Sequence, residues 1–152
     1  LDMRTGITVI TADITIADYI DESLPSVDVI MLGGELRKGH RYLFGPLTMA
    51  AIATIHADLA VICPGAFVAG RGFVTDFPQM AEIKQAAMSA ASHSVALMDA
   101  SKLTSRGTYC FAPIHAVDHI VIDKDDEGTL SDALDKLPND AKRPQLIVTT
   151  EQ

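Results

Sequence analysis

The sequence predicts an α/β fold in which a mostly parallel β-sheet lies between helices. Short apolar runs with β-strand character recur along the chain and alternate with segments whose apolar residues have helical spacing. Prolines and glycines stand where these segments should begin or end. A strand that returns to its sheet through a helix runs parallel to its neighbour, so this alternation implies a parallel sheet with helices on its faces.

Strands and helices are expected in regular alternation, interrupted by a loop between the fourth and fifth strands. The strands are expected at 7–11, 27–32, 59–63, 95–98, 120–122 and 146–148. The helices are expected at 14–20, 47–55, 78–91 and 130–137. Pro46 and Pro78 suit the first turns of their helices, and Pro138 ends the last one. A glycine-bearing loop is expected between the third strand and Pro78.

The length and the absence of a linker-like segment predict one domain over residues 1–152. The charge balance of 12 Lys+Arg against 20 Asp+Glu gives a net charge of −8, with no basic stripe. Protein–DNA affinity depends on cations that displace counterions from phosphates, so this composition argues against direct DNA binding. A small anionic ligand is still compatible, because a few local cations can oppose the overall sign.

No apolar run approaches the ~20 residues that a membrane-spanning helix needs. Asp2, Asp13 and Asp18 lie where a signal peptide would have an uncharged core, so a cytoplasmic location is the default expectation. Cys63 and Cys110 do not form a disulfide framework or a metal-binding pair. Cys63 ends an apolar run and is expected to be a buried thiol.

Ligands of parallel α/β sheets bind beyond the carboxyl ends of the strands, so the residues after each strand are the candidates. The strongest group follows the fourth strand, where Asp99, Ser101 and Lys102 stand close together. Asp can accept hydrogen bonds from sugar hydroxyls, and Lys offers a point charge to phosphate. The alternative is that Asp99 or Ser101 caps a helix and Lys102 is solvated.

Weaker candidates follow the second and third strands. Gly33 and Gly34 could let backbone N–H groups approach an anion, with Arg37 as a charged fork, or they could form a plain turn. Gly65 opens the glycine-bearing loop, which is either a phosphate-facing loop or an irregular surface loop. Lys84 lies beside apolar residues of its helix; the spacing favours a side chain that snorkels to water over one that points into a cleft.

The sequence offers no pattern typical of a metal, cofactor or catalytic site. The histidines are scattered without ligand spacing, and the P-loop, the GxGxxG fingerprint and the GxSxG elbow are missing. No pair of carboxylates has a spacing that supports acid–base catalysis. We therefore expect no metal and no cofactor.

The segments after the strands together resemble the C-terminal domain of DeoR-family bacterial transcriptional repressors, over about residues 6–123. The matching markers are Leu32-Gly33-Gly34-Glu35-Leu36-Arg37, Phe44-Gly45-Pro46, His56-Ala57-Asp58, Gly72-Phe73-Val74-Thr75, Ala81-Glu82-Ile83-Lys84 and Asp99-Ala100-Ser101-Lys102. Several ordered markers at matching intervals are more specific than any one of them.

The resemblance implies a three-layer, Rossmann-like fold akin to ribose-5-phosphate isomerase and CoA-transferase-type enzymes. It implies a sensor that binds a phosphorylated sugar or related metabolite and controls a separate N-terminal winged helix-turn-helix. Asp99, Ser101 and Lys102 then match the family's effector-binding segment. The winged helix-turn-helix and the family's first sensor strand, with its Gly-Thr-Thr loop, are not in this sequence. Cys63 and Ala66 stand where the family often has Gly.

Three functions are compatible with these observations. The leading hypothesis is an effector-binding domain of a repressor of carbohydrate metabolism, which acts on DNA only through the other domain and forms a homo-oligomer. The second is a sugar-phosphate isomerase with Asp99 or Glu82 as the base. The third is a module that serves only for dimerisation.

Overall fold

Helices packed on parallel strands form the main part of the computed structural model, which describes residues 5–149. The chain divides into two compact units, one up to Ile55 and one from His56 onward. The single domain that the sequence predicts depends on how these two units pack together, and it stays a prediction.

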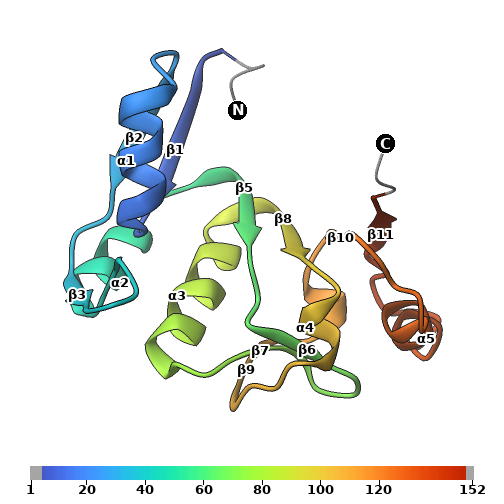
Figure 1. The fold of residues 1–152 in the computed structure, drawn as a ribbon. Coiled ribbons are helices and arrows are strands. Elements are labelled where there is room, and N and C mark those ends of the chain that lie inside the picture. The colour runs from blue at the N-terminus through green and yellow to red at the C-terminus, as the bar shows by residue number, and fades with distance from the viewer. Residues whose placement is uncertain (1–4, 150–152) are drawn as a thin grey trace. The chain divides into compact units, whose positions relative to one another are not determined.

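The first unit begins with a strand–helix–strand motif made of β1 (Ile7–Thr11), α1 (Ile14–Ser23) and β2 (Val27–Met31). The two strands pair in parallel, as Figure 1 shows. The carboxylate of Asp13 caps α1 by accepting the N–H groups of Thr15 and Ile16. Ile20 of α1 and Leu24 at its C-terminal end pack against Val27 of β2, with Ile7, Val9 and Val29 partly buried beside them.

A short antiparallel hairpin follows, made of β3 (Glu35–Arg37) and β4 (Tyr42–Phe44), and α2 (Pro46–Ile52) comes next. The sequence analysis did not predict this hairpin. Gly34, just before it, has φ 146°, and a Cβ at this position would lie 2.5 Å from the carbonyl oxygen of Phe44. Close approach of the backbone therefore requires glycine at position 34.

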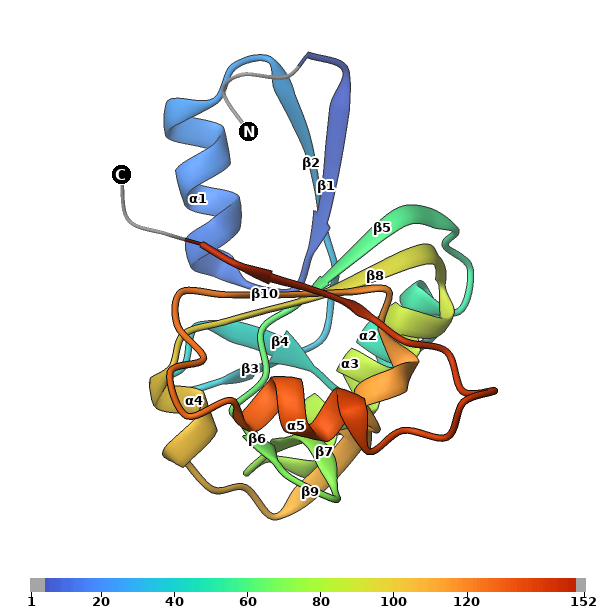
Figure 2. The ribbon, with the colours of Figure 1, turned by 90° about the vertical axis from the view of Figure 1, so that its right-hand side faces the viewer.

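The second unit contains a four-stranded parallel sheet with the order β11-β10-β8-β5. Its strands are β5 (Ala57–Ile62), β8 (Ala91–Met98), β10 (His119–Ile122) and β11 (Gln145–Val148). Helices α3 (Pro78–Ser89), α4 (Ser101–Thr104) and α5 (Thr129–Asp135) connect or follow them, as Figure 2 shows. The predicted α/β fold with a mostly parallel, Rossmann-like sheet is confirmed.

One face of this sheet holds the hydrophobic core. Alternate strand residues point into it, and side chains of α3 and α5 cover it. The core residues from the strands and from α5 include Ala60, Ile62, Ala96, Met98, Ile120, Ile122 and Leu130. The opposite face carries the apolar side chains of Leu59, Val61 and Leu97, which are exposed.

A three-stranded antiparallel sheet completes the unit, formed by β6 (Ala66–Val68), β7 (Gly72–Thr75) and β9 (Tyr109–Ala112) in that order. Phe67, Phe73 and Phe111 from these strands extend the core, with ring centroids of Phe67 and Phe73 5.5 Å apart. The loop expected after the third strand is thus a β-hairpin in the structure, and Tyr109–Ala112 is a strand that the sequence analysis missed.

The regular elements that the sequence predicts from periodicity are confirmed, with ends that differ by a few residues. The prediction for Cys63 is wrong, because the strand ends at Ile62 and the thiol of Cys63 is exposed in the turn that follows. Among residues 5–149, no helix combines the length and the apolar character needed to cross a membrane.

Candidate functional site

The carboxyl ends of β5, β8 and β10 meet at one edge of the parallel sheet. Ile62 is in register with Ala96, and Ile122 is in register with Met98, so the three strands end side by side. Figure 1 shows β5 and β8 pointing the same way, toward the region where α4 begins. The turns after these strands, from Cys63, Asp99 and Asp123, therefore lie along one edge, where a ligand of this fold class is expected.

Asp99 and Ser101 form a compact turn at this edge. Asp99 Oδ1 accepts the backbone N–H of Ser101 at 2.9 Å and also accepts the Ser101 hydroxyl. The hydroxyl bond, helped by this N–H and by nearby Lys102, lowers the pKa of the exposed Asp99 carboxyl. Oδ1 is thus engaged in a local turn, although Ala100 is the N-cap of α4 and no side-chain hydrogen bond caps this helix. Within residues 5–149 Oδ2 accepts no hydrogen bond, which leaves it available to a ligand hydroxyl.

Asp123 is a site residue that the sequence analysis did not single out. Its Oδ1 accepts the N–H of Ala100 at 2.7 Å and that of Lys124 at 2.8 Å, which links the turn after β10 to the turn after β8. The signal that could have found it is its position directly after a predicted strand. Asp123 holds the Asp99–Lys102 segment in place.

Lys84 projects from α3 to the same edge. Its ammonium donates to the carbonyl oxygen of Cys63, directly after β5, and Nζ lies 5.4 Å from the ring centroid of Phe111. The preference for a snorkelling side chain is therefore wrong: the amine is partly buried and points toward the strand ends. Burial lowers the pKa of Lys84 to about 8; Cys63 partly offsets this, and the charge of Lys102 lowers it further.

The two lysines place positive charge at the strand ends without a paired carboxylate. Lys102 lies in the first turn of α4, with its backbone N–H bonded to the carbonyl of Asp99 at 3.0 Å. In the described part of the chain, neither Lys84 nor Lys102 forms a salt bridge, although the charge of Lys102 acts on the nearby Asp99 carboxyl. This edge therefore carries the charge that an anionic ligand needs, beside carboxylates held by local hydrogen bonds.

Gly65 has a structural role next to the site. Its N–H donates to the carbonyl of Val74 at 3.0 Å, and a Cβ would lie 3.2 Å from the same oxygen. Gly65 thus lets the chain turn from β5 into the hairpin while staying close to β7. Its N–H is already bonded, so it is not free to bind an anion.

Gly33, Gly34 and Arg37 belong to the first unit. The hydroxyl of Thr48, which is fully buried, donates to the carbonyl of Gly33 at 2.6 Å. The guanidinium of Arg37 donates to the hydroxyl of Tyr42 and lies 5.5 Å from that ring's centroid, on the hairpin that follows. Close approach of Phe44 and Thr48 accounts for Gly34, whereas a Cβ at Gly33 would meet no atom within 4 Å. A role in ligand binding stays a prediction.

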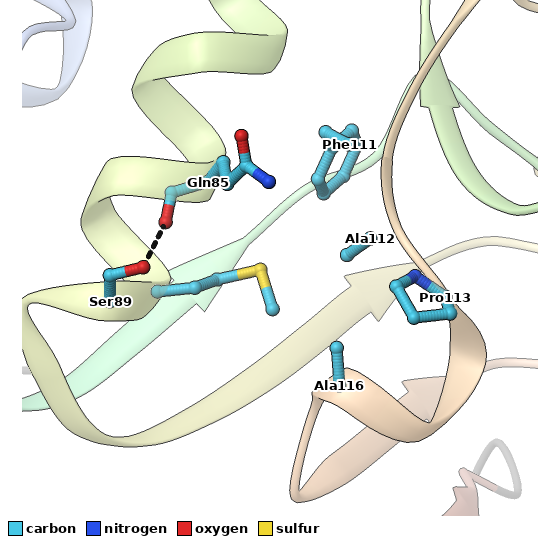
Figure 3. Close-up of a pocket in the computed structure, with 7 residues that line it drawn as sticks. Gln85, Ser89, Phe111, Ala112, Pro113 and Ala116 are labelled. Atoms are coloured by element: carbon cyan, nitrogen blue, oxygen red, sulfur yellow. Dashed lines mark hydrogen bonds between the residues drawn. The ribbon is translucent and has the colours of Figure 1, made fainter.

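A small pocket lies apart from the strand ends, near the C-terminal half of α3. Its volume is about 270 Å³, and it is bounded by α3, β9 and the 3₁₀ helix Ile114–Ala116 (Figure 3). The side chains that line it are Gln85, Met88, Ser89, Phe111, Ala112, Pro113 and Ala116. None of these is charged, so the pocket is not suited to a phosphate group.

A larger groove of about 690 Å³ runs between α5 and the turn of the β6–β7 hairpin. Its charged side chains are Arg71, Glu127, Asp132 and Lys136, beside His115 and over an apolar base that includes Phe67 and Ile114. The two acidic groups offset the cations here. No group of three or more His, Cys, Asp or Glu residues in the described residues is placed to hold a metal ion.

A comparison against known families identifies the family of this chain. A model of the DeoR C-terminal sensor domain matches residues 1–124. The chain belongs to this family. The sensor domain also resembles a curated protein, the HTH-type transcriptional repressor GlcR of Bacillus subtilis strain 168, with 29% identity over 129 residues. The match covers 85% of this chain and 49% of that protein, so the chain spans about half the length of its relative.

Proposed function

We propose that this sensor domain binds a phosphorylated sugar or a related phosphorylated metabolite at the carboxyl ends of β5, β8 and β10. Binding would control the attachment of a separate domain of the same protein to DNA. The observation that carries the proposal is the pair Lys84 and Lys102, which lie near each other at this edge and form no salt bridge in residues 5–149. The nearest carboxyl, that of Asp99, lies beside Lys102.

The neighbouring groups are suited to the rest of such a ligand. Oδ2 of the exposed Asp99 can accept a sugar hydroxyl, and Lys102 can donate to phosphate. Asp123 fixes the turn that carries both residues. The net charge of −8 supports the assignment of DNA contact to another part of the protein.

We propose a sensor without turnover, rather than an isomerase. A general base works best with a pKa near the operating pH, whereas the hydrogen bond from Ser101 moves the pKa of Asp99 in the opposite direction. The other candidate base, Glu82, is exposed on α3, two residues before Lys84. An isomerase assay on pentose and hexose phosphates should show no turnover; turnover lost in Asp99→Asn would contradict this point.

Thermal-shift measurements with phosphorylated sugars, aldonates and polyol phosphates test the binding proposal. A true effector at hundredfold excess over its Kd should raise Tm by roughly 5–10 °C. Lys102→Ala should weaken binding about tenfold or more, because a charged hydrogen bond is lost. Asp99→Asn should weaken the binding of sugar phosphates but leave the binding of inorganic phosphate unchanged.

Lys136→Ala is the matched control, since it removes an exposed lysine at the end of α5 that lines the larger groove. If Lys136→Ala abolishes binding while Lys102→Ala does not, the ligand occupies that groove and the proposed site is wrong. A panel that produces no Tm shift in the wild-type chain would contradict the sensor proposal itself.

We further propose that the sensor acts as a homo-oligomer whose equilibrium the effector shifts. A ligand changes an equilibrium only through different affinities for its two states. Sedimentation velocity with and without the effector found above separates the alternatives. A ligand-dependent change supports a sensor, and a stable dimer that binds no ligand supports a module that serves only for dimerisation.

A further inference from the structure

The ammonium of Lys84 lies beside a backbone carbonyl, a titratable thiol, an aromatic ring and another cation. The end of β5 contributes the Cys63 carbonyl as its hydrogen-bond acceptor and the Cys63 thiol nearby. Strand β9 contributes the uncharged ring of Phe111, and α4 contributes Lys102. None of these elements places a carboxylate against the amine in the described residues.

This arrangement makes the charged form of Lys84 costly while the site is empty. Burial removes water from the ammonium, and Lys102 repels it, which together account for a pKa of about 8 in place of 10.5. The Asp99 carboxyl acts on Lys102, whereas Lys84 has no carboxylate beside it, so an anion between the two lysines would supply a counter-ion to Lys84. It would favour the charged form of both amines at once.

We propose that an anion held by Lys84 and Lys102 binds together with a proton on Lys84, so that this site senses phosphate dianions less well as the pH rises above neutrality. This inference rests on the proposed function, because it concerns the same site. It goes further by making Lys84 the residue that couples effector affinity to pH.

The expected pH dependence can be separated from that of the ligand. The second pKa of a phosphate monoester is about 6, so the ligand is essentially dianionic above neutral pH and binds no further proton. Loss of the proton from free Lys84 then controls the affinity. Binding should be about tenfold weaker at about pH 9 than at about pH 7 if Lys84 stays charged in the complex.

The experiment uses the whole 152-residue chain with glycerol phosphate, a phosphate monoester, as the phosphate probe. Lysine side chains are labelled for NMR and titrated with and without phosphate, with sodium chloride at matched ionic strength as the reference. The resonance of Lys84 should titrate at a higher pH when phosphate is present, and Lys136 should not respond. The phosphate Kd should rise about tenfold across the same range.

Variants distinguish Lys84 from its neighbours. Lys84→Arg keeps a charge that cannot be lost in this range, so its phosphate Kd should no longer depend on pH. Cys63→Ala removes the thiol and should keep the pH dependence. If these variants do not fold, the titration of the lysines in the wild-type chain still tests the proposal.

Different results would contradict this inference and the proposed function. Phosphate binding that perturbs Lys102 but leaves the titration of Lys84 unchanged overturns this inference and leaves the proposed function standing. A pH effect that persists in Lys84→Arg also overturns it. If glycerol phosphate and every phosphorylated sugar in the panel leave both lysines unperturbed at all pH values, the proposed function fails as well.

Discussion

Replacing Lys84 by methionine should stabilise the folded chain at neutral pH while removing a group that the proposed function needs. Methionine has a similar length and no charge, so it can occupy the space between α3 and the Phe111 ring. The lowering of the Lys84 pKa from 10.5 to about 8 corresponds to about 3 kcal/mol, an upper limit because the side chain is only partly buried.

The sign follows from proton binding in the two states. Between about pH 8 and pH 10.5 the unfolded chain holds a proton on Lys84 that the folded chain has lost, so the stability of the wild type rises with pH in this window. The free energy of unfolding that the wild type loses by burying the charged amine is therefore at its full value near pH 7. This loss falls to about 1 kcal/mol near pH 10. The Lys84→Met variant would carry no such penalty at either pH.

The contacts that the substitution removes offset part of this gain. The hydrogen bond to the Cys63 carbonyl contributes about 1 kcal/mol, and the cation–π contact with Phe111 contributes about 0.5–1 kcal/mol. The net stabilisation of Lys84→Met at pH 7 is then about 1–2 kcal/mol. It should disappear or change sign near pH 10, because the penalty in the wild type falls by about 2 kcal/mol.

Urea unfolding of both proteins at neutral and high pH measures this difference. All other titrating groups are common to the two chains, so the change in the difference with pH reports on Lys84 alone. Lys84→Gln is the control that keeps a neutral donor. A variant that is less stable than wild type by a constant amount at both pH values would refute the reasoning, since the charge of Lys84 would then carry no penalty.

Two further predictions concern stability away from the site. Gly34→Ala should destabilise the chain by about 2–4 kcal/mol, because its Cβ would collide with the carbonyl of Phe44 at a positive φ. Gly39→Ala, in open space at φ 79°, should cost only about 1 kcal/mol, and equal losses in thermal unfolding would argue against the packing explanation. Asp118 accepts the N–H of buried Ser94 at 2.7 Å, and its bond with Lys142 lowers its pKa to about 2 from 3.8. The ionised Asp118 carboxylate should stabilise the fold fully above about pH 4, and this stabilisation should be lost as the pH falls through 2. Asp118→Ala should therefore cost about 1–3 kcal/mol of stability at pH 7. It should also flatten the dependence of stability on pH between about pH 4 and pH 2.

The long elements could be predicted from the sequence because each shows its periodicity over enough residues. Helix α3 spans Pro78–Ser89, and β1 and β2 are five-residue runs rich in β-branched residues that lie near glycine or proline. The short hairpins β3–β4 and β6–β7 were missed, because strands of three or four residues with glycines between them give no clear alternation. They are stabilised by tertiary contacts rather than by local pattern.

The site was predicted in part for the same reason. Asp99, Ser101 and Lys102 follow a recognisable strand and lie at the sheet edge, as expected from the fold. The orientation of Lys84 could not be read from its helix, because its acceptor is the Cys63 carbonyl, which is 21 residues away in the sequence. The expectation for Cys63 failed by a single residue, since the apolar run extends one position beyond the strand.

The energetics of Lys84 also give a reason for the incomplete charge pairing of this edge. A carboxylate partner would remove the penalty of about 3 kcal/mol, yet it would compete with any anionic ligand for the same ammonium. Lysines without a salt bridge lower the folding stability of the ligand-free chain. Binding of a counter-ion recovers that free energy. A structural salt bridge requires a carboxylate beside Lys84, whereas an anion sensor requires that this position stay open to the ligand. An effector would therefore recover the folding stability that the charged, ligand-free site loses.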